Sequence, residues 1–86
     1  MDIKKELRRH GETQPALLLE KLKTLDLSEK ELIIMKLRYV DRLEFKQIPI
    51  KAGVSMRWVY KLHSRAIKKT LDSLKLNISL TLDIHK

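Results

Sequence analysis

Basic side chains in segment 55–69 give the sequence its most evident chemistry. The segment carries five basic residues and no acidic one, and Lys and Arg are strong donors to phosphate oxygens. On a helix, with about 100° per residue, its polar residues fall on one side: Arg57, Lys61, Ser64 and Lys68, with Tyr60 and Arg65 at the margins. Its apolar residues fall on the opposite side: Val59, Leu62 and Ala66. The segment is therefore predicted to form a helix with a basic outer face and an apolar inner face.

This pattern is typical of a helix that lies in the major groove of DNA. Such a helix presents its solvent face to base edges and phosphates, while its other face is anchored on preceding helices. Its first turns, with Met56, Arg57 and Lys61, would enter deepest. Arg57 is the most natural guanine reader, because its guanidinium fork can bond two acceptors. An isolated run of charges is more often a solvated surface, so the interpretation depends on the neighbouring elements.

The residues before Ser55 predict a tight turn between two helices. A short helical segment from Leu43 to Ala52 stops at Gly53, whose missing side chain permits a left-handed backbone. Ser55 is a favoured N-cap and begins a long helix predicted to run to about Leu74. Pro49 lacks an amide and should kink or shorten the first of these helices. The spacing is that of two helices crossing at a steep angle.

Helices are predicted upstream as well. They are residues 1–10, a helix that opens at Pro15, and a helix from Ser28 to about Asp41. Gly11 stands where glycine often follows a helix C-terminus, and Pro15 suits a first turn, where its missing amide costs nothing. Ser28 and Glu31 have the spacing of a capping box.

The C-terminal segment has a different periodicity. Four apolar residues alternate there with polar ones: Ile78, Leu80, Leu82 and Ile84. A period of two predicts a strand, and a lone strand needs a partner. Three alternatives stay open: pairing with a second copy, packing on the helices, or a flexible tail. We expect an all-α fold: a small helix-turn-helix bundle of four to five helices, followed by this strand or tail. The expected division of the chain is an N-terminal helical extension (residues 1–26), a helix-turn-helix domain (27–76) and a C-terminal tail or strand (77–86).

Five short motifs between Leu27 and Leu74 carry a family resemblance. They are Leu27-Ser28-Glu29-Lys30-Glu31, Leu37-Arg38-Tyr39, Gln47-Ile48, Gly53-Val54-Ser55 and Arg65-Ala66-Ile67-Lys68-Lys69. Together they resemble region four of the main bacterial sigma factors, which reads the upstream promoter element, and related small phage regulators. The resemblance implies a base-reading helix whose matching positions here are Met56, Arg57, Trp58 and Lys61. It departs at Pro49, where a small residue is usual, and at the less polar Met56 and Trp58. The chain has no room for the promoter-melting and core-binding regions, so we expect a stand-alone regulator.

Composition narrows the function classes. Eighty-six residues suit one small domain, and a formal charge of +8 attracts polyanions, nucleic acid first and an acidic membrane second. The chain has no cysteine, which excludes thiolate catalysis and cysteine-ligated zinc, and the cytoplasm is the default location. His10, His63 and His85 are too scattered for a metal site, and His63 is expected to pack or to bond a phosphate. We expect no metal, no cofactor, no catalysis and no membrane span.

The leading hypothesis is a sequence-specific regulator of transcription that binds double-stranded DNA. Its contact residues would be Ser55, Met56, Arg57, Trp58, Tyr60, Lys61, Ser64, Arg65 and Lys68. Arg65, Lys68 and Lys69 would serve phosphates, and packing is favoured over DNA contact for Trp58. A second hypothesis is an adaptor that binds RNA polymerase or a sigma factor with little DNA contact. A third, a basic helix on an acidic membrane, is disfavoured because the inner face is committed to a core. Homodimerisation stays open.

Overall fold

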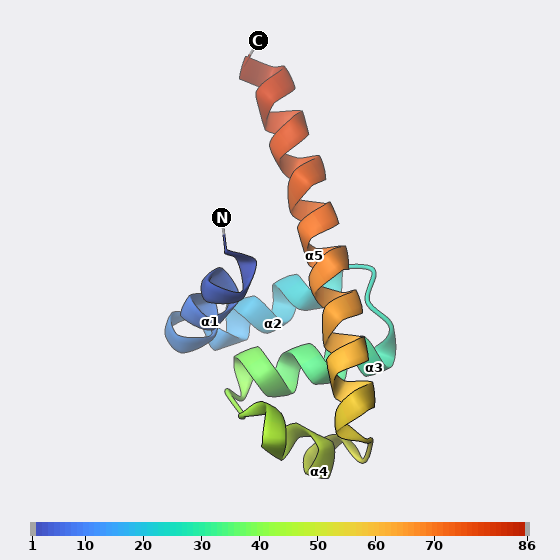
Figure 1. Ribbon diagram of the computed structural model, residues 1–86. Coiled ribbons are helices and arrows are strands. Elements are labelled where there is room, and N and C mark those ends of the chain that lie inside the picture. Colours follow the sequence, from blue (N-terminus) through green and yellow to red (C-terminus); the bar gives the residue numbers. More distant parts are fainter. Residues whose placement is uncertain (1, 86) are drawn as a thin grey trace.

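Helices alone make up the regular structure of the backbone described in the computed structural model. The structure describes the backbone of residues 2–85 and the side chains of residues 2–73. The elements are α1 (Ile3–Thr13), α2 (Pro15–Thr24), α3 (Glu29–Met35), the π-helical η1 (Lys36–Val40), the 3-10 helix η2 (Phe45–Gln47), α4 (Ile48–Ala52) and α5 (Met56–His85). Figure 1 shows the shorter helices gathered beside the first half of α5, whose remainder extends beyond them. The predicted all-α bundle is confirmed.

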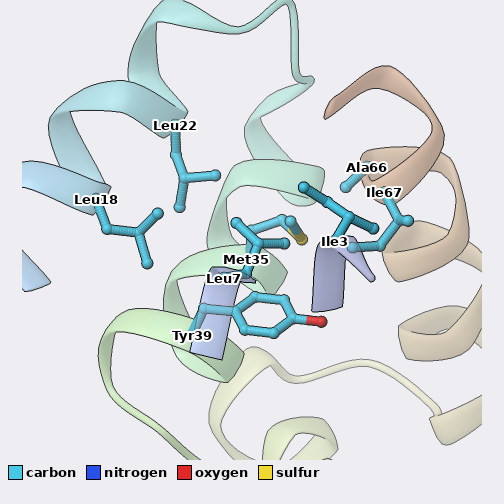
Figure 2. Packing of buried hydrophobic residues seen from close by; sticks show 8 residues of the cluster. All are labelled: Ile3, Leu7, Leu18, Leu22, Met35, Tyr39, Ala66 and Ile67. Carbon is cyan, nitrogen blue, oxygen red and sulfur yellow. The ribbon is translucent and has the colours of Figure 1, made fainter. Parts of the chain in front are cut away.

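The continuous helix formed by α3 and η1 packs into two apolar clusters. The turn cluster consists of Ile34, Ile48, Val59 and Leu62. The N-terminal cluster consists of Ile3, Leu7, Leu18, Leu22, Met35, Tyr39, Ala66 and Ile67, and Figure 2 shows these side chains converging. Both α3–η1 and α5 contribute to both clusters. These two helices therefore join the helix-turn-helix to α1 and α2.

Local capping signals set where several helices begin. The Ser28 hydroxyl accepts a hydrogen bond from the Glu31 amide at 3.2 Å, and the Ser28 amide donates to the Glu31 carboxylate at 2.7 Å. The predicted capping box is confirmed, as is Pro15 in the first turn of α2. At α1, the Asp2 carboxylate accepts from the Lys4 amide at 3.1 Å, a cap that the sequence analysis missed.

The prediction that Gly11 ends the first helix is wrong. α1 continues through Gly11 to Thr13, and Gly11 is buried. A Cβ atom on Gly11 would lie 1.8 Å from the carbonyl oxygen of Tyr39 in η1. Gly11 is thus explained by the close approach of two helix backbones, which a local sequence pattern does not reveal.

The prediction of a strand over residues 78–84 is also wrong, and so is the helix end near Leu74. α5 runs through both positions to His85. A helix closes its hydrogen bonds within its own segment, whereas a strand needs a neighbouring strand, and the backbone of residues 2–85 contains none. The alternative in which this segment pairs as a strand with a second copy needs an extended backbone and is contradicted with the strand, whereas packing of the segment on the helices concerns side chains outside the described ones.

The two glycines should respond differently to substitution. Gly11→Ala is expected to lower the free energy of unfolding by about 3 kcal/mol, because a backbone oxygen in the way cannot rotate aside. This loss exceeds the gain in helix propensity of about 1 kcal/mol. Gly53→Ala should lower the free energy of unfolding by only about 1–2 kcal/mol. The backbone there is left-handed, with φ of 69°, but an added Cβ would meet no neighbouring atom within 4 Å.

Urea unfolding followed by circular dichroism measures both changes. Asn tolerates the left-handed region, so Gly53→Asn should recover part of the loss, whereas Gly11→Asn should recover none. Equal losses for the two alanine variants would contradict the steric role of Gly11.

Candidate nucleic-acid interface

The turn between α4 and α5 is built from residues 49–58. Gly53 is left-handed, with φ of 69°, and its amide donates to the Pro49 carbonyl at 2.9 Å. The Ser55 hydroxyl accepts from the Trp58 amide at 3.2 Å, which confirms the predicted N-cap of α5. Pro49 lies in the first turn of α4, where its missing amide costs no helix hydrogen bond, and the helix predicted from Leu43 to Ala52 is divided into η2 and the five-residue α4. Figure 1 shows α4 lying across the lower end of α5.

The polar residues predicted to face DNA lie on the outer side of α5. Most of the predicted contact residues are exposed: Ser55, Arg57, Trp58, Tyr60, Lys61, Ser64, Arg65 and Lys68. Met56 is half-buried. On the inner side, Val59 and Ala66 have no exposed surface. The structure thus brings the predicted residues together on one side of a helix whose other side is core; we call this outer side the α5 face.

The cations on the α5 face are not neutralised by ion pairs with the described side chains. Four of them form no ion pair within the side chains of residues 2–73: Arg57, Lys61, Arg65 and Lys68. No acidic residue occurs between positions 55 and 69 of the chain to offset them. A surface of this kind attracts anions such as phosphates.

Lys69 was predicted to serve a phosphate together with Arg65 and Lys68; in the structure it forms an ion pair, and its phosphate role stays a prediction. Its ammonium lies 2.7 Å from the carboxylate of Glu31, whose side chain is only 3% exposed. Burial opposes ionisation of Glu31, but hydrogen bonds from Lys69 and Ser28 lower its pKa overall. Lys69 therefore ties α5 to α3. The sequence shows the charge of Lys69 but not a partner 38 positions away.

Trp58 is more accessible than predicted. Packing was favoured for it, yet 47% of its surface is exposed, and it belongs to neither apolar cluster. The Lys61 ammonium lies 5.1 Å from the centre of its ring, within the range of a cation–π contact. Trp58 and Lys61 thus form a continuous patch on the first turns of α5.

His63 is a core residue. It is 5% exposed, and its Nε2 forms a hydrogen bond of 2.7 Å with the Tyr39 hydroxyl. The Phe45 ring meets His63 edge-on, with ring centres 4.9 Å apart. Burial, together with the charges of Lys4 and Arg38, lowers the pKa of His63 to about 4. Of its two predicted roles, packing is confirmed.

Phe45 is a supporting residue that the sequence analysis did not assign to the site. Its ring lies 5.3 Å, centre to centre, from that of Tyr60 on the α5 face. It also lies below the Arg38 guanidinium, whose carbon is 4.6 Å from the ring centre. Phe45 thereby positions residues of η1 and α5, and its place in the short helix before the turn is the only signal for this in the sequence.

Comparison with known proteins found no similar protein. No protein family model matches the sequence, and neither a curated protein nor a solved structure is similar to it at a significant level. In the part of the chain with described side chains, no group of three or more potential ligands could hold a metal ion. No helix in the described residues is long and apolar enough to cross a membrane. The role of the α5 face therefore rests on its geometry and charge.

The buried state of His63 should make the fold sensitive to acid. In the unfolded chain a histidine has a pKa near 6.5, whereas burial lowers the pKa of His63 in the folded protein to about 4. Between these values the unfolded state binds more protons, so stability is complete above pH 6.5 and falls as the pH drops towards 4. The expected loss is roughly 3 kcal/mol, measured by urea unfolding across this range.

His63→Gln, which cannot titrate, should flatten this pH dependence, and His10→Gln serves as the matched control that should not. An NMR titration of the His63 ring gives its pKa directly. A ring that titrates near 6.5 in the folded protein would refute the interpretation.

Proposed function

We propose that this protein binds double-stranded DNA and regulates transcription, with the first turns of α5 in the major groove. The supporting observation is the α5 face, whose cations are exposed and form no ion pair within the described side chains, on a helix anchored by its opposite side. The major groove is about 12 Å wide, which matches a helix of about 10–12 Å including side chains. The resemblance to region four of sigma factors agrees with this placement.

The α5 face divides into reading and positioning residues. Met56 and Arg57 lie in the first turn, which enters the groove deepest, and Arg57 can bond two acceptors of one guanine. Trp58 is half-exposed and can contact a thymine methyl group or a sugar. Arg65 and Lys68 lie further along the helix, where they would contact phosphates.

The net charge supports the same partner. With +8 on 86 residues, association with a duplex releases condensed counterions, so affinity should fall steeply with salt. Selection of bound duplexes from a random pool would reveal the preferred sequence. A pair of half-sites about one helical turn apart would indicate a homodimer.

A second candidate function is an adaptor that binds RNA polymerase or a sigma factor. It is favoured by exposed apolar side chains near the turn, since Ile50 in α4 is 84% exposed and Ile33 in α3 is 43% exposed. Ile33 borders a hollow that Ala52, Val54 and Leu62 also line. A pull-down with polymerase, set beside a duplex titration at two salt concentrations, separates the two functions.

Substitutions on the α5 face should separate reading from positioning. Arg57→Ala is expected to relax specificity at one base pair, by roughly 1–3 kcal/mol, because a bidentate base contact is lost. Lys68→Ala should weaken all sequences similarly and lower the slope of log affinity against log salt by about 1. Fluorescence anisotropy with the selected duplex and its single-base variants measures both effects.

Lys23→Ala is the matched control, because it removes the same charge from the exposed surface of α2. It should change neither specificity nor the salt slope appreciably. Equal losses on every sequence for both α5 variants would contradict the division of roles, and the absence of duplex binding in dilute salt would refute the function.

A further inference from the structure

A second basic cluster lies outside the α5 face. Arg8 of α1, Arg38 of η1 and Arg42 in the loop after η1 line one hollow of about 120 Å³, together with Glu12 and Tyr39. Three segments of the chain thus each contribute an arginine to the lining of one hollow.

The hollow carries excess positive charge. Glu12 is the only carboxylate among its lining residues, and it lies 3.8 Å from Arg42. Both side chains of this pair are more than half exposed, at 61% and 56%, so the pair is weak. Neither Arg8 nor Arg38 forms an ion pair within residues 2–73. The buried Nε of Arg38 has no hydrogen-bond partner in the same part of the chain.

The backbone and the neighbouring ring hold Arg38 and Arg42 in place. Nη1 of Arg38 donates to the Leu43 carbonyl at 2.9 Å, and its guanidinium stacks on Phe45. Arg42 has φ of 61°, a left-handed conformation that costs a residue with a side chain about 1–2 kcal/mol. The Leu43 amide then donates to the Leu37 carbonyl at 3.0 Å, which closes the end of η1.

Aromatic contacts connect this hollow to the α5 face. The Arg38 guanidinium lies 4.6 Å from the Phe45 ring centre, and that centre lies 5.3 Å from the Tyr60 ring. Tyr60 is 52% exposed at the margin of the α5 face. The two basic surfaces are therefore neighbours, separated by one aromatic ring.

We infer that Arg8, Arg38 and Arg42 form a binding hollow for a backbone phosphate of the duplex, outside the groove that α5 enters. Arginine suits this ligand because its planar fork can donate two hydrogen bonds to a phosphate. The inference rests on the proposed function and extends the DNA contact to α1. It assigns a role to the N-terminal segment, which lies outside the region that resembles sigma factors.

The test uses two variants of exposed residues in the full chain. Arg8→Gln removes one charge, and Arg42→Asn removes another while keeping a residue that tolerates the left-handed backbone. Arg9→Gln is the matched control, since Arg9 is the next residue of α1 and bonds Glu6 at 2.6 Å outside the hollow. Affinities are measured by anisotropy at several salt concentrations, with duplexes shortened stepwise from each end of the selected site.

For the unaltered protein, affinity should rise when the duplex is lengthened past one end of the site. Arg8→Gln and Arg42→Asn should each lose that gain, by about threefold to tenfold in dilute salt, and each should lower the salt slope by about 1. Base preference should not change. Arg9→Gln should behave like the unaltered protein.

Two results would overturn the inference while leaving the proposed function intact. One is duplex binding by Arg8→Gln and Arg42→Asn with unaltered affinity, length dependence and salt slope. The other is thermal stabilisation by inorganic phosphate that Arg8→Gln abolishes without changing duplex affinity, which would assign the hollow to a small free phosphate. An unaltered protein that binds no duplex would overturn both proposals.

Discussion

The packing of the inner side of α5 against α3 and η1 is the constraint on which the other features depend. Val59 and Ala66 on this side have no exposed surface. Burying side chains of this type contributes roughly 1–3 kcal/mol each. The Lys69–Glu31 ion pair and the Tyr39–His63 hydrogen bond fasten the same two segments with polar contacts. Because these contacts hold one side of α5, its basic side is presented in a fixed orientation.

This arrangement divides the cations of α5 into two groups. Lys69 serves the fold, since it neutralises a buried carboxylate that would otherwise be costly. The cations of the α5 face form no ion pair within the described side chains. They therefore add positive electrostatic potential to the surface and do not stabilise the fold through ion pairs. A single helix thus combines a structural ion pair with a surface suited to a polyanion.

The packing of the N-terminal helix α1 against η1 forms the second basic surface. α1 approaches η1 so closely that only a glycine fits at position 11, and Arg8 of α1 and Arg38 of η1 line the same hollow. The left-handed Arg42 completes the cluster from the following loop. The second basic surface is therefore a product of helix packing, and no single stretch of sequence contains it.

By itself, the sequence determined the features that depend on neighbouring residues. The caps at Ser28 and Ser55, the turn at Gly53 and the amphipathic pattern of α5 were all predicted correctly, because each is decided within a few positions along the chain. The alternation over residues 78–84 predicted a strand, but the backbone there continues the helix of α5.

Only the tertiary structure decided which polar and aromatic side chains meet. It placed Lys69 on Glu31, left Trp58 half-exposed, buried His63 against Tyr39 and explained Gly11 by a neighbouring backbone. These outcomes depend on partners far away in the sequence, whose distance is set by how the helices pack. The helical pattern of a sequence predicts which side of a helix is polar. The partner of each polar group depends on the packing of the neighbouring helices.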